Sequence, residues 1–319
     1  MKILLVNVDS KIPNVALQKL QFYYERKGSK VVVIKDDSVG ILPFIDGYDK
    51  VYVSCIFDYN KRFCKKWEGL AIIGGSGYSI TKKLPLEIEQ VKPRKNIGFT
   101  MRGCLRNCPW CIVQQKEGQC RITGDIYDIW DGQAKNITLL DNNILGVPKQ
   151  FFKIAGQIKK ENLQVDFNSG FDHHLLTNEI CQEIFTLQYC ADWGGSKKPS
   201  TAKIRFAFDH ISYKKSVLRA LKMLQRHGLK KWQTRWYIYV GTSDTVKSVL
   251  ERINILRNAK QLVFVMLDRD SKVQNNLEFK KIYAWTCHVS AYAAQPYYQY
   301  RKQFSKINDD RPNLFNQKI

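Results

Sequence analysis

The sequence lacks features that define whole classes of protein. It contains no apolar run approaching the roughly 18 residues of a membrane-spanning helix, so we expect no transmembrane segment. Residues 1–9 become polar too early for a secretory signal peptide and instead predict a buried strand. We therefore expect a cytoplasmic protein that does not associate with membranes.

Acidic residues are scarce. The chain has 29 Asp and Glu against 51 Lys and Arg, which gives a formal net charge of +22. A positive excess of this size attracts polyanions and raises their rate of encounter with the protein. The lysines are spread along the chain in repeated Lys-Lys pairs rather than gathered into one block. Two interpretations stay open: an RNA or other polyanionic partner, and a lysine-rich composition that fills solvated surfaces.

The remaining composition is that of a globular protein. With 319 residues, 44% of them hydrophobic, the chain can form a large core and two domains. Its nine cysteines are odd in number and scattered, apart from one cluster, which does not match a disulfide framework. This pattern agrees with a reducing compartment.

The one cluster of cysteines carries the strongest chemical signal. Cys104, Cys108 and Cys111 follow a C-x₃-C-x₂-C spacing, and residues 96–100 before them predict a short strand. Three thiolates can hold three irons of a [4Fe-4S] cluster and leave the fourth iron without a protein ligand. The alternative is a zinc knuckle with Cys120 as the fourth ligand. Structural zinc sites usually pair two C-x₂-C clips, and this region has one.

This cysteine loop resembles the signature of the radical S-adenosylmethionine (SAM) superfamily, which also has an aromatic residue where Trp110 stands. The resemblance implies a [4Fe-4S] cluster on the three cysteines, with SAM bound to the open iron. It implies reductive cleavage of SAM to a 5′-deoxyadenosyl radical, which abstracts hydrogen from a substrate. It also implies an electron donor of the flavodoxin or ferredoxin type.

The chain after the loop alternates strands and helices, which indicates an α/β fold with parallel strands. Together with the strand before the loop there are six β units, the number in the partial (β/α)₆ barrel of the radical SAM family. We expect this barrel, with a C-terminal extension, over residues 93–319. The expected later strands are 135–140, 164–168, 203–208, 235–240 and 262–267, with helices at 148–161, 178–189, 214–227 and 246–258 and a last strand-like segment at 282–289.

Active sites of β/α barrels lie at the carboxyl ends of the strands, where this chain has its polar residues. Asp209 stands where the family often has Glu, and Gly241 stands in a turn that lets backbone approach the adenine. Asp141-Asn142-Asn143 replaces the family's Gly-Gly-Glu. Each of these residues alone is equally explained as a cap of the following helix. The positions that the resemblance assigns to SAM are Trp110, Asp141, Asn142, Asn168, Ser169, Asp172, Asp209 and Gly241.

Residues 1–92 predict a doubly wound parallel α/β domain ahead of the barrel, with a first helix at 15–27. Through residues 48–55 and 72–75 this stretch resembles the cobalamin-binding-like domain found before many radical SAM barrels. The histidine that can ligate cobalt in that family is missing, because the first histidine is residue 173. We therefore do not expect cobalamin. The expected strands are 2–8, 30–34, 48–55 and 71–75.

Other stretches are weaker candidates. Gly74-Gly75-Ser76-Gly77 is either a phosphate cradle or, as we favour, a tight turn. His173-His174 suggests an acid/base or metal pair, although adjacent side chains should point apart, so that at most one faces a ligand. Residues 190–202 predict a polar loop over the substrate. Residues 292–304 interleave tyrosines with cations, which either stack on bases or pack on the barrel. Cys287-His288 is a further candidate, and no catalytic residue is assigned.

The sequence thus predicts a radical SAM enzyme, with a nucleic acid or nucleotide as substrate on charge alone. One alternative is a cobalamin-dependent radical SAM methyltransferase or a methylthiotransferase-like enzyme. Only Cys55 and Cys64 precede the main motif, whereas methylthiotransferases have three cysteines there, and no RNA-binding module is expected after the barrel. The other alternative is a non-catalytic iron–sulfur protein.

Overall fold

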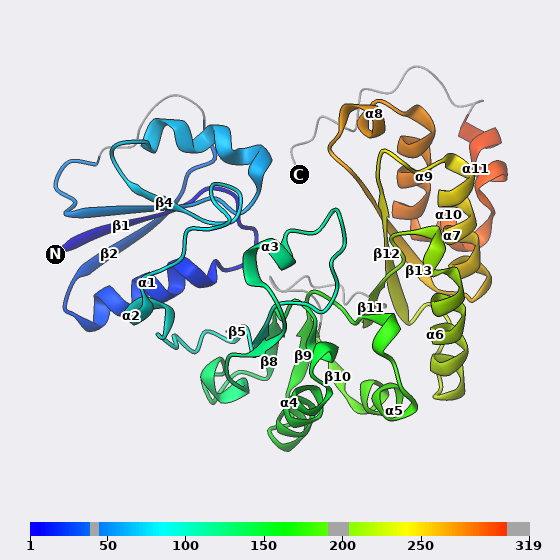
Figure 1. Ribbon diagram of the computed structural model, residues 1–319, viewed down its shortest axis with the longest axis horizontal. Helices are drawn as coiled ribbons and strands as arrows, with labels where there is room; N and C mark the ends of the chain where they lie inside the picture. Colours follow the sequence, from blue (N-terminus) through cyan, green and yellow to red (C-terminus); the bar gives the residue numbers. More distant parts are fainter. Residues whose placement is uncertain (39–44, 191–203, 305–319) are drawn as a thin grey trace. The chain divides into compact units, whose positions relative to one another are not determined.

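The computed structural model describes residues 1–38, 45–190 and 204–304 (Figure 1). It divides into two compact units, Met1–Ser169 with Leu187–Pro199, and Gly170–Thr186 with Ser200–Ile319. The domain division predicted between residues 92 and 93 falls inside the first unit and stays a prediction. Of the predicted substrate loop, residues 191–202 lie outside the described residues. None of the described helices is both long and apolar enough to cross a membrane.

The first unit begins with a sheet of four parallel strands in the order β2-β1-β3-β4. The order reverses at β1, which confirms the doubly wound topology predicted for this region. Asn14 caps the first helix, because its side chain accepts hydrogen bonds from the first turn of backbone N–H groups. The elements are β1 (Lys2–Asn7), α1 (Val15–Arg26), β2 (Lys30–Lys35), β3 (Lys50–Ser54), η1 (Asp58–Trp67) and β4 (Ile72–Gly74).

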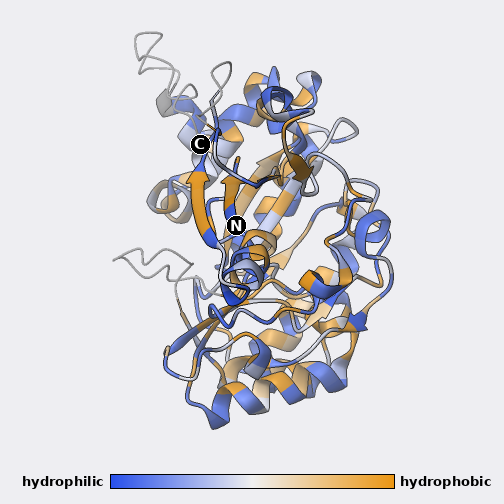
Figure 2. Ribbon diagram, turned by 90° about the vertical axis from the view of Figure 1, so that its left-hand side faces the viewer, coloured by the Kyte–Doolittle hydropathy of each residue, from blue (hydrophilic) through white to orange (hydrophobic). Residues whose placement is uncertain are grey.

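This sheet is covered on both faces, with α1 on one side and the light-blue η1 on the other (Figure 1). Ile3 and Leu5 pack with the apolar face of α1. Leu4 and Val6 point the opposite way and pack with Trp67 of η1. Because side chains alternate along a strand, burial on both faces requires a continuous apolar run such as that of β1. Figure 2 shows the consequence, with largely orange strands and helices that alternate orange and blue.

The second sheet of the first unit is also parallel, in the order β10-β9-β8-β5. Along the chain the strands of this sheet occur in the order β5, β8, β9 and β10, and each pairs with the one before it, so the order does not reverse. A short antiparallel hairpin, β6 with β7, follows β5. The elements are α2 (Leu86–Glu89), β5 (Ile97–Gly98), β6 (Met101–Arg102), α3 (Val113–Glu117), β7 (Arg121–Ile122), η2 (Ile126–Asp128), β8 (Asn136–Leu139), η3 (Ile144–Gly146), α4 (Pro148–Lys160), β9 (Gln164–Phe167) and β10 (Gln188–Tyr189).

The second unit has a parallel sheet in the order β11-β12-β13. Its core includes Trp236 of β12, whose ring stacks on Phe206 of β11 at 4.7 Å between centroids. The elements are η4 (His173–Leu175), α5 (Asn178–Thr186), β11 (Ile204–Ala207), η5 (Ile211–Tyr213), α6 (Lys214–Arg226), β12 (Thr234–Val240), α7 (Val246–Asn258), β13 (Leu262–Leu267), α8 (Ser271–Gln274), α9 (Leu277–Cys287), α10 (Val289–Ala294) and α11 (Tyr297–Phe304).

The observed elements confirm a parallel α/β fold, with two differences in detail. The strand-like segment predicted at 282–289 is wrong, because Leu277–Cys287 forms α9, with Phe279, Ile282 and Trp285 buried at helical spacing. The helix predicted over 178–189 ends at Thr186, and the next residues form β10. The described strands form four separate sheets and no closed barrel. The partial barrel therefore stays a prediction.

Candidate functional site

The cysteine loop lies between the two strands of the β6–β7 hairpin, whose backbone holds its ends together. The N–H of Cys104 donates to the carbonyl oxygen of Gly118 at 3.1 Å. Gly103 has a φ of +86°, and a Cβ there would lie 2.2 Å from the carbonyl oxygen of Gln119. Only glycine fits both the conformation and the space. The first cysteine is thus fixed at the hairpin.

The other two cysteines follow in a tight turn. The N–H of Cys111 donates to the carbonyl oxygen of Cys108 at 3.0 Å, and α3 begins two residues later. The amide of Gln114 in α3 also donates to the carbonyl oxygen of Cys104. Cys104 and Cys108 are half-buried and Cys111 is exposed, and Trp110 between them is half-buried. The thiols therefore lie on a structured loop that solvent can reach.

The end of β8 anchors this loop. The side-chain oxygen of Asn142 accepts the N–H of Gly103 at 2.9 Å. The side-chain amide of Asn143 points at the Sγ of Cys104, 3.4 Å away, and the backbone N–H of Arg106 points at the same sulfur from 3.3 Å. Hydrogen bonds to ligand sulfurs are one of the main influences on the potential of an iron–sulfur cluster. Two residues predicted as part of a SAM-binding strand end thus support the cysteine loop.

Asp141 is buried in the protein and bonded to the strand that enters the loop. Its carboxylate accepts the backbone N–H groups of Thr100 at 2.6 Å and Met101 at 2.8 Å, and the hydroxyl of Thr100 at 2.7 Å. Burial nevertheless raises the pKa of this carboxyl to about 6, because desolvation outweighs the three hydrogen bonds. The contacts give Asp141 a structural role in positioning residues 100–101.

The spacing of the thiols bears on which metal group the loop fits. In the described residues, one group of three potential metal ligands has its ligand atoms within 4.8 Å of one another, and the cysteine loop is not that group. A tetrahedral zinc ion with bonds of about 2.3 Å to sulfur needs sulfurs about 3.8 Å apart. Thiolates of a cluster bind different irons and lie farther apart. The three thiols are thus not gathered at the spacing that a single tetrahedral zinc ion requires.

The predicted SAM-site residues are distributed over both units. In the first unit, Asn168 donates its backbone N–H to Leu139 at 2.9 Å, and the hydroxyl of Ser169 donates to the carbonyl oxygen of Leu140 at 3.5 Å. These contacts place both residues at the carboxyl end of β9, beside the end of β8. Of the other predicted residues, the second unit contains Asp172, Asp209 and Gly241.

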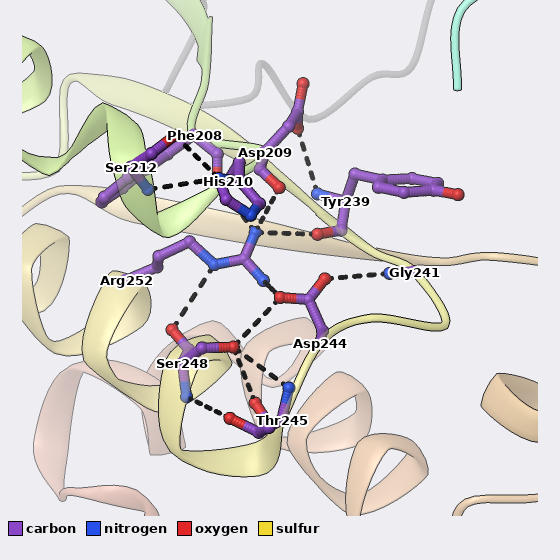
Figure 3. Close-up of polar contacts among 10 residues, drawn as sticks. All are labelled: Phe208, Asp209, His210, Ser212, Tyr239, Gly241, Asp244, Thr245, Ser248 and Arg252. Carbon is purple, nitrogen blue, oxygen red and sulfur yellow. Dashed lines mark hydrogen bonds and ion pairs between the residues drawn. The ribbon is translucent and has the colours of Figure 1, made fainter. Parts of the chain in front are cut away.

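In the second unit, a buried arginine joins the ends of β11 and β12 (Figure 3). Arg252 of α7 donates to the carbonyl oxygens of Phe208 at 3.1 Å, Asp209 at 2.7 Å and Tyr239 at 2.8 Å. It also pairs with the carboxylate of Asp244 at 2.6 Å. The sequence pattern did not lead us to expect a role for this residue. The feature that could have indicated its buried role is that Arg252 is a single charged residue on the otherwise apolar face of α7, among Val249, Ile253 and Leu256.

The two predicted site residues here are held by the same network. Asp209 accepts the backbone N–H of Tyr239 at 3.1 Å, and the N–H of Gly241 donates to Asp244 at 3.0 Å. A Cβ at Gly241 would lie 2.8 Å from the ring of Tyr239, so that glycine allows this ring to pack. The hydroxyl of Tyr239 donates to Asp268, and burial together with this carboxylate raises the pKa of Tyr239. The strand ends form a fixed polar edge.

The glycine turn of the first sheet packs against a neighbouring loop. A Cβ at Gly75, whose φ is +91°, would lie 2.2 Å from the carbonyl oxygen of Cys55, and one at Gly77 would lie 2.3 Å from the carbonyl carbon of Phe57. Asp9 fixes the same loop by accepting the N–H groups of Ile56 and Phe57, each at 2.8 Å. These contacts support the tight turn rather than the phosphate cradle.

The expectation that the side chains of His173 and His174 point apart is wrong. The Nε2 of His173 lies 3.1 Å from the Oγ of Ser216, and the Nε2 of His174 lies 3.3 Å from the same oxygen. A 3₁₀ turn after Asp172 brings the two rings together, with centroids 3.9 Å apart. The reasoning from alternating side chains failed because it applies to strands.

Neither the comparison with protein-family models nor the comparison with curated proteins gives a match to this sequence. The resemblance to radical SAM enzymes therefore rests on the residues and geometry of this chain alone.

Proposed function

We propose that this protein is a radical SAM enzyme whose cluster is bound by Cys104, Cys108 and Cys111. The observation that carries the proposal is the C-x₃-C-x₂-C loop itself, whose first cysteine is held in the β6–β7 hairpin and whose backbone is bonded to the residues that follow β8. When bound, the cluster would supply the electron that reductively cleaves SAM, and hydrogen would then be taken from a substrate. The residue that reacts with that substrate is not assigned.

The contacts of the loop suit this role. Asn142 holds the backbone of Gly103, and Asn143 and Arg106 direct N–H groups at the sulfur of Cys104. Such groups favour negative charge on a ligand sulfur and tune the potential of a cluster. Cys111 is exposed, so the loop has a face that a flavodoxin- or ferredoxin-type donor can approach.

The topology also supports the proposal. The strands of the β10-β9-β8-β5 sheet and of the β11-β12-β13 sheet follow chain order without reversal, and all are parallel. Sequential parallel order is typical of β/α barrels, whereas a doubly wound sheet reverses, as the β2-β1-β3-β4 sheet does. The partial (β/α)₆ barrel is part of this proposal.

The substrate class is proposed on charge. With a net charge of +22, a nucleic acid or another polyanion is the favoured substrate, in a cytoplasmic, reducing environment. A cobalamin-dependent enzyme is less favoured, because the loop after β1 has no histidine and the glycine turn at residues 74–77 is packed against the chain itself.

The test is reductive cleavage of SAM. The protein is reconstituted with iron and sulfide without oxygen, reduced with dithionite, and given SAM, and 5′-deoxyadenosine is measured by liquid chromatography and mass spectrometry. We expect product from the wild type and from Cys287→Ser, which alters an exposed cysteine outside the loop, and none from Cys108→Ser. An intact cluster that yields no product would favour the non-catalytic alternative and contradict the proposal.

A further inference from the structure

Two histidine rings and a carboxylate converge on the first turn of α6 in the second unit. The Nε2 atoms of His173 and His174 lie 3.1 Å and 3.3 Å from the Oγ of Ser216. On its other side, the His174 ring places Nδ1 3.1 Å from a carboxylate oxygen of Asp172. Asp172, His173 and His174 each offer a ligand atom within 4.8 Å of the others, and no other group of three in the described residues does so.

The contact with Asp172 sets which nitrogen of His174 faces the serine. With Nδ1 directed at the carboxylate, Nε2 is directed at the Oγ of Ser216. The Nε2 of His173 lies near the same oxygen, which is also 2.8 Å from the carbonyl oxygen of Tyr213. Two imidazole nitrogens and a hydroxyl oxygen therefore converge, as the ligands of a single ion do.

The surroundings are those of a built site rather than of a surface cluster. His173 is 4% exposed, and the side chains of Asp172 and His174 are 12% and 26% exposed. The ring of Trp236 lies 5.9 Å from that of His173, and the ring of Tyr213 lies edge-on to His174 at 5.0 Å between centroids. The aromatic rings restrict the imidazoles, and solvent reaches the cluster from the side of His174.

We propose that His173, His174 and Ser216 bind one divalent transition-metal ion, with Asp172 orienting His174. A metal with bonds of about 2.0 Å in tetrahedral geometry needs ligand atoms about 3.3 Å apart, which matches the two distances to Ser216. The carboxylate behind the ring is the usual outer partner of a metal-bound imidazole, and it fixes Nε2 as the ligand. Imidazole and oxygen ligands suit Zn²⁺. Nothing in this site depends on the cysteine loop.

The experiment measures Zn²⁺ binding to the full-length chain by calorimetry. Cys104, Cys108 and Cys111 are all replaced by serine in this protein, so that the loop thiols cannot take the ion. We expect one high-affinity Zn²⁺ per chain, with a dissociation constant below about 10 μM. Co²⁺ in its place should give visible d–d bands that are reduced in the His174 variant described next, which ties them to this cluster rather than to remaining cysteines.

Three substitutions in that background locate the site. His174→Gln should abolish high-affinity binding. Asp172→Asn, which keeps an oxygen to cap the turn, should weaken it about tenfold or more. His227→Gln changes a half-buried histidine of the same unit that bonds Asn178, and it should bind Zn²⁺ as the parent does. Circular dichroism of each variant reports folding, and if His174→Gln is unfolded, Asp172→Asn decides the matter.

Two results would overturn the proposal. The first is equal Zn²⁺ affinity in the parent protein and Asp172→Asn, since the ion would then lie elsewhere. The second is no high-affinity Zn²⁺ binding by the parent chain, since the two histidines would then only hydrogen-bond to Ser216 and Asp172. Both results come from Zn²⁺ binding to a chain without the loop thiols, so they are read separately from cleavage of SAM, although Asp172 is also one of the residues that the resemblance assigns to SAM.

Discussion

Replacing Asp141 with asparagine should remove one contribution to the pH dependence of the free energy of unfolding. The carboxyl is buried, and this burial raises its pKa from 3.8 to about 6. A shift of about two pKa units corresponds to about 3 kcal/mol. Between pH 4 and pH 6 the folded protein therefore binds more protons at this group than the unfolded chain does. Stability falls as the pH rises through this window and levels off above it.

The measurement is urea unfolding of the wild type and Asp141→Asn at intervals from pH 4.5 to pH 8 under reducing conditions. The asparagine stays neutral and its side-chain oxygen can still accept the N–H groups of Thr100 and Met101. The free energy of unfolding of the variant minus that of the wild type should rise by about 2 kcal/mol between pH 4.5 and pH 8. Comparing the two proteins at each pH cancels the titration of all other groups.

A matched control uses Asp131, an exposed carboxyl whose pKa hydrogen bonds from Ala134, Asn96 and Gln133 lower to about 2. Its contribution is lost only as the pH falls from about 4 toward 2. The difference between the wild type and Asp131→Asn should therefore stay constant over the same range. A constant difference for Asp141→Asn as well, or one that grows toward low pH, would contradict the assignment of Asp141 as a buried carboxyl whose ionisation is costly.

Three other outcomes follow from the described contacts. Gly75→Ala should lower the free energy of unfolding by more than about 2 kcal/mol in urea, because its Cβ would overlap the backbone of Cys55. The control is Gly69→Ala, where φ is also positive but the space is open, and it should cost about 1 kcal/mol. Arg252→Met should cost about 3–5 kcal/mol, because it leaves the buried Asp244 unpaired; an unfolding midpoint like that of the wild type would contradict the network. Asn143→Ala should make the potential of the reconstituted cluster more negative in a redox titration, because it removes an N–H directed at ligand sulfur, and an unchanged potential would exclude that contact.

The sequence predicted the sheets well because their signals are local. Apolar runs such as residues 2–8 and the helix at residues 15–27 carry a periodicity that tertiary contacts reinforce. The turn after residue 74 was also read correctly as tight. The reason, a close approach to residues 55–57, is visible only once both loops are in place.

The roles of individual residues were harder to predict, because they depend on partners distant in the chain. Asp141 binds residues 40 positions earlier, and Asn143 reaches a cysteine 39 positions earlier. Asp141 was predicted to bind SAM, and Asn143 belongs to the same strand end. Arg252 was missed because a helical arginine is most often solvated, and here five oxygen acceptors surround it. The pairing of His173 with His174 required a 3₁₀ turn that the sequence pattern did not indicate.

The most direct test of the three-thiol loop is electron paramagnetic resonance of the reduced, reconstituted protein with and without SAM. If Cys104, Cys108 and Cys111 leave one iron open, SAM binds that iron, and the spectrum of the reduced [4Fe-4S] cluster changes when SAM is added, in the wild type and in Cys287→Ser alike. A spectrum that SAM leaves unchanged, or a protein that takes up zinc and no iron–sulfur cluster, would contradict the proposed function.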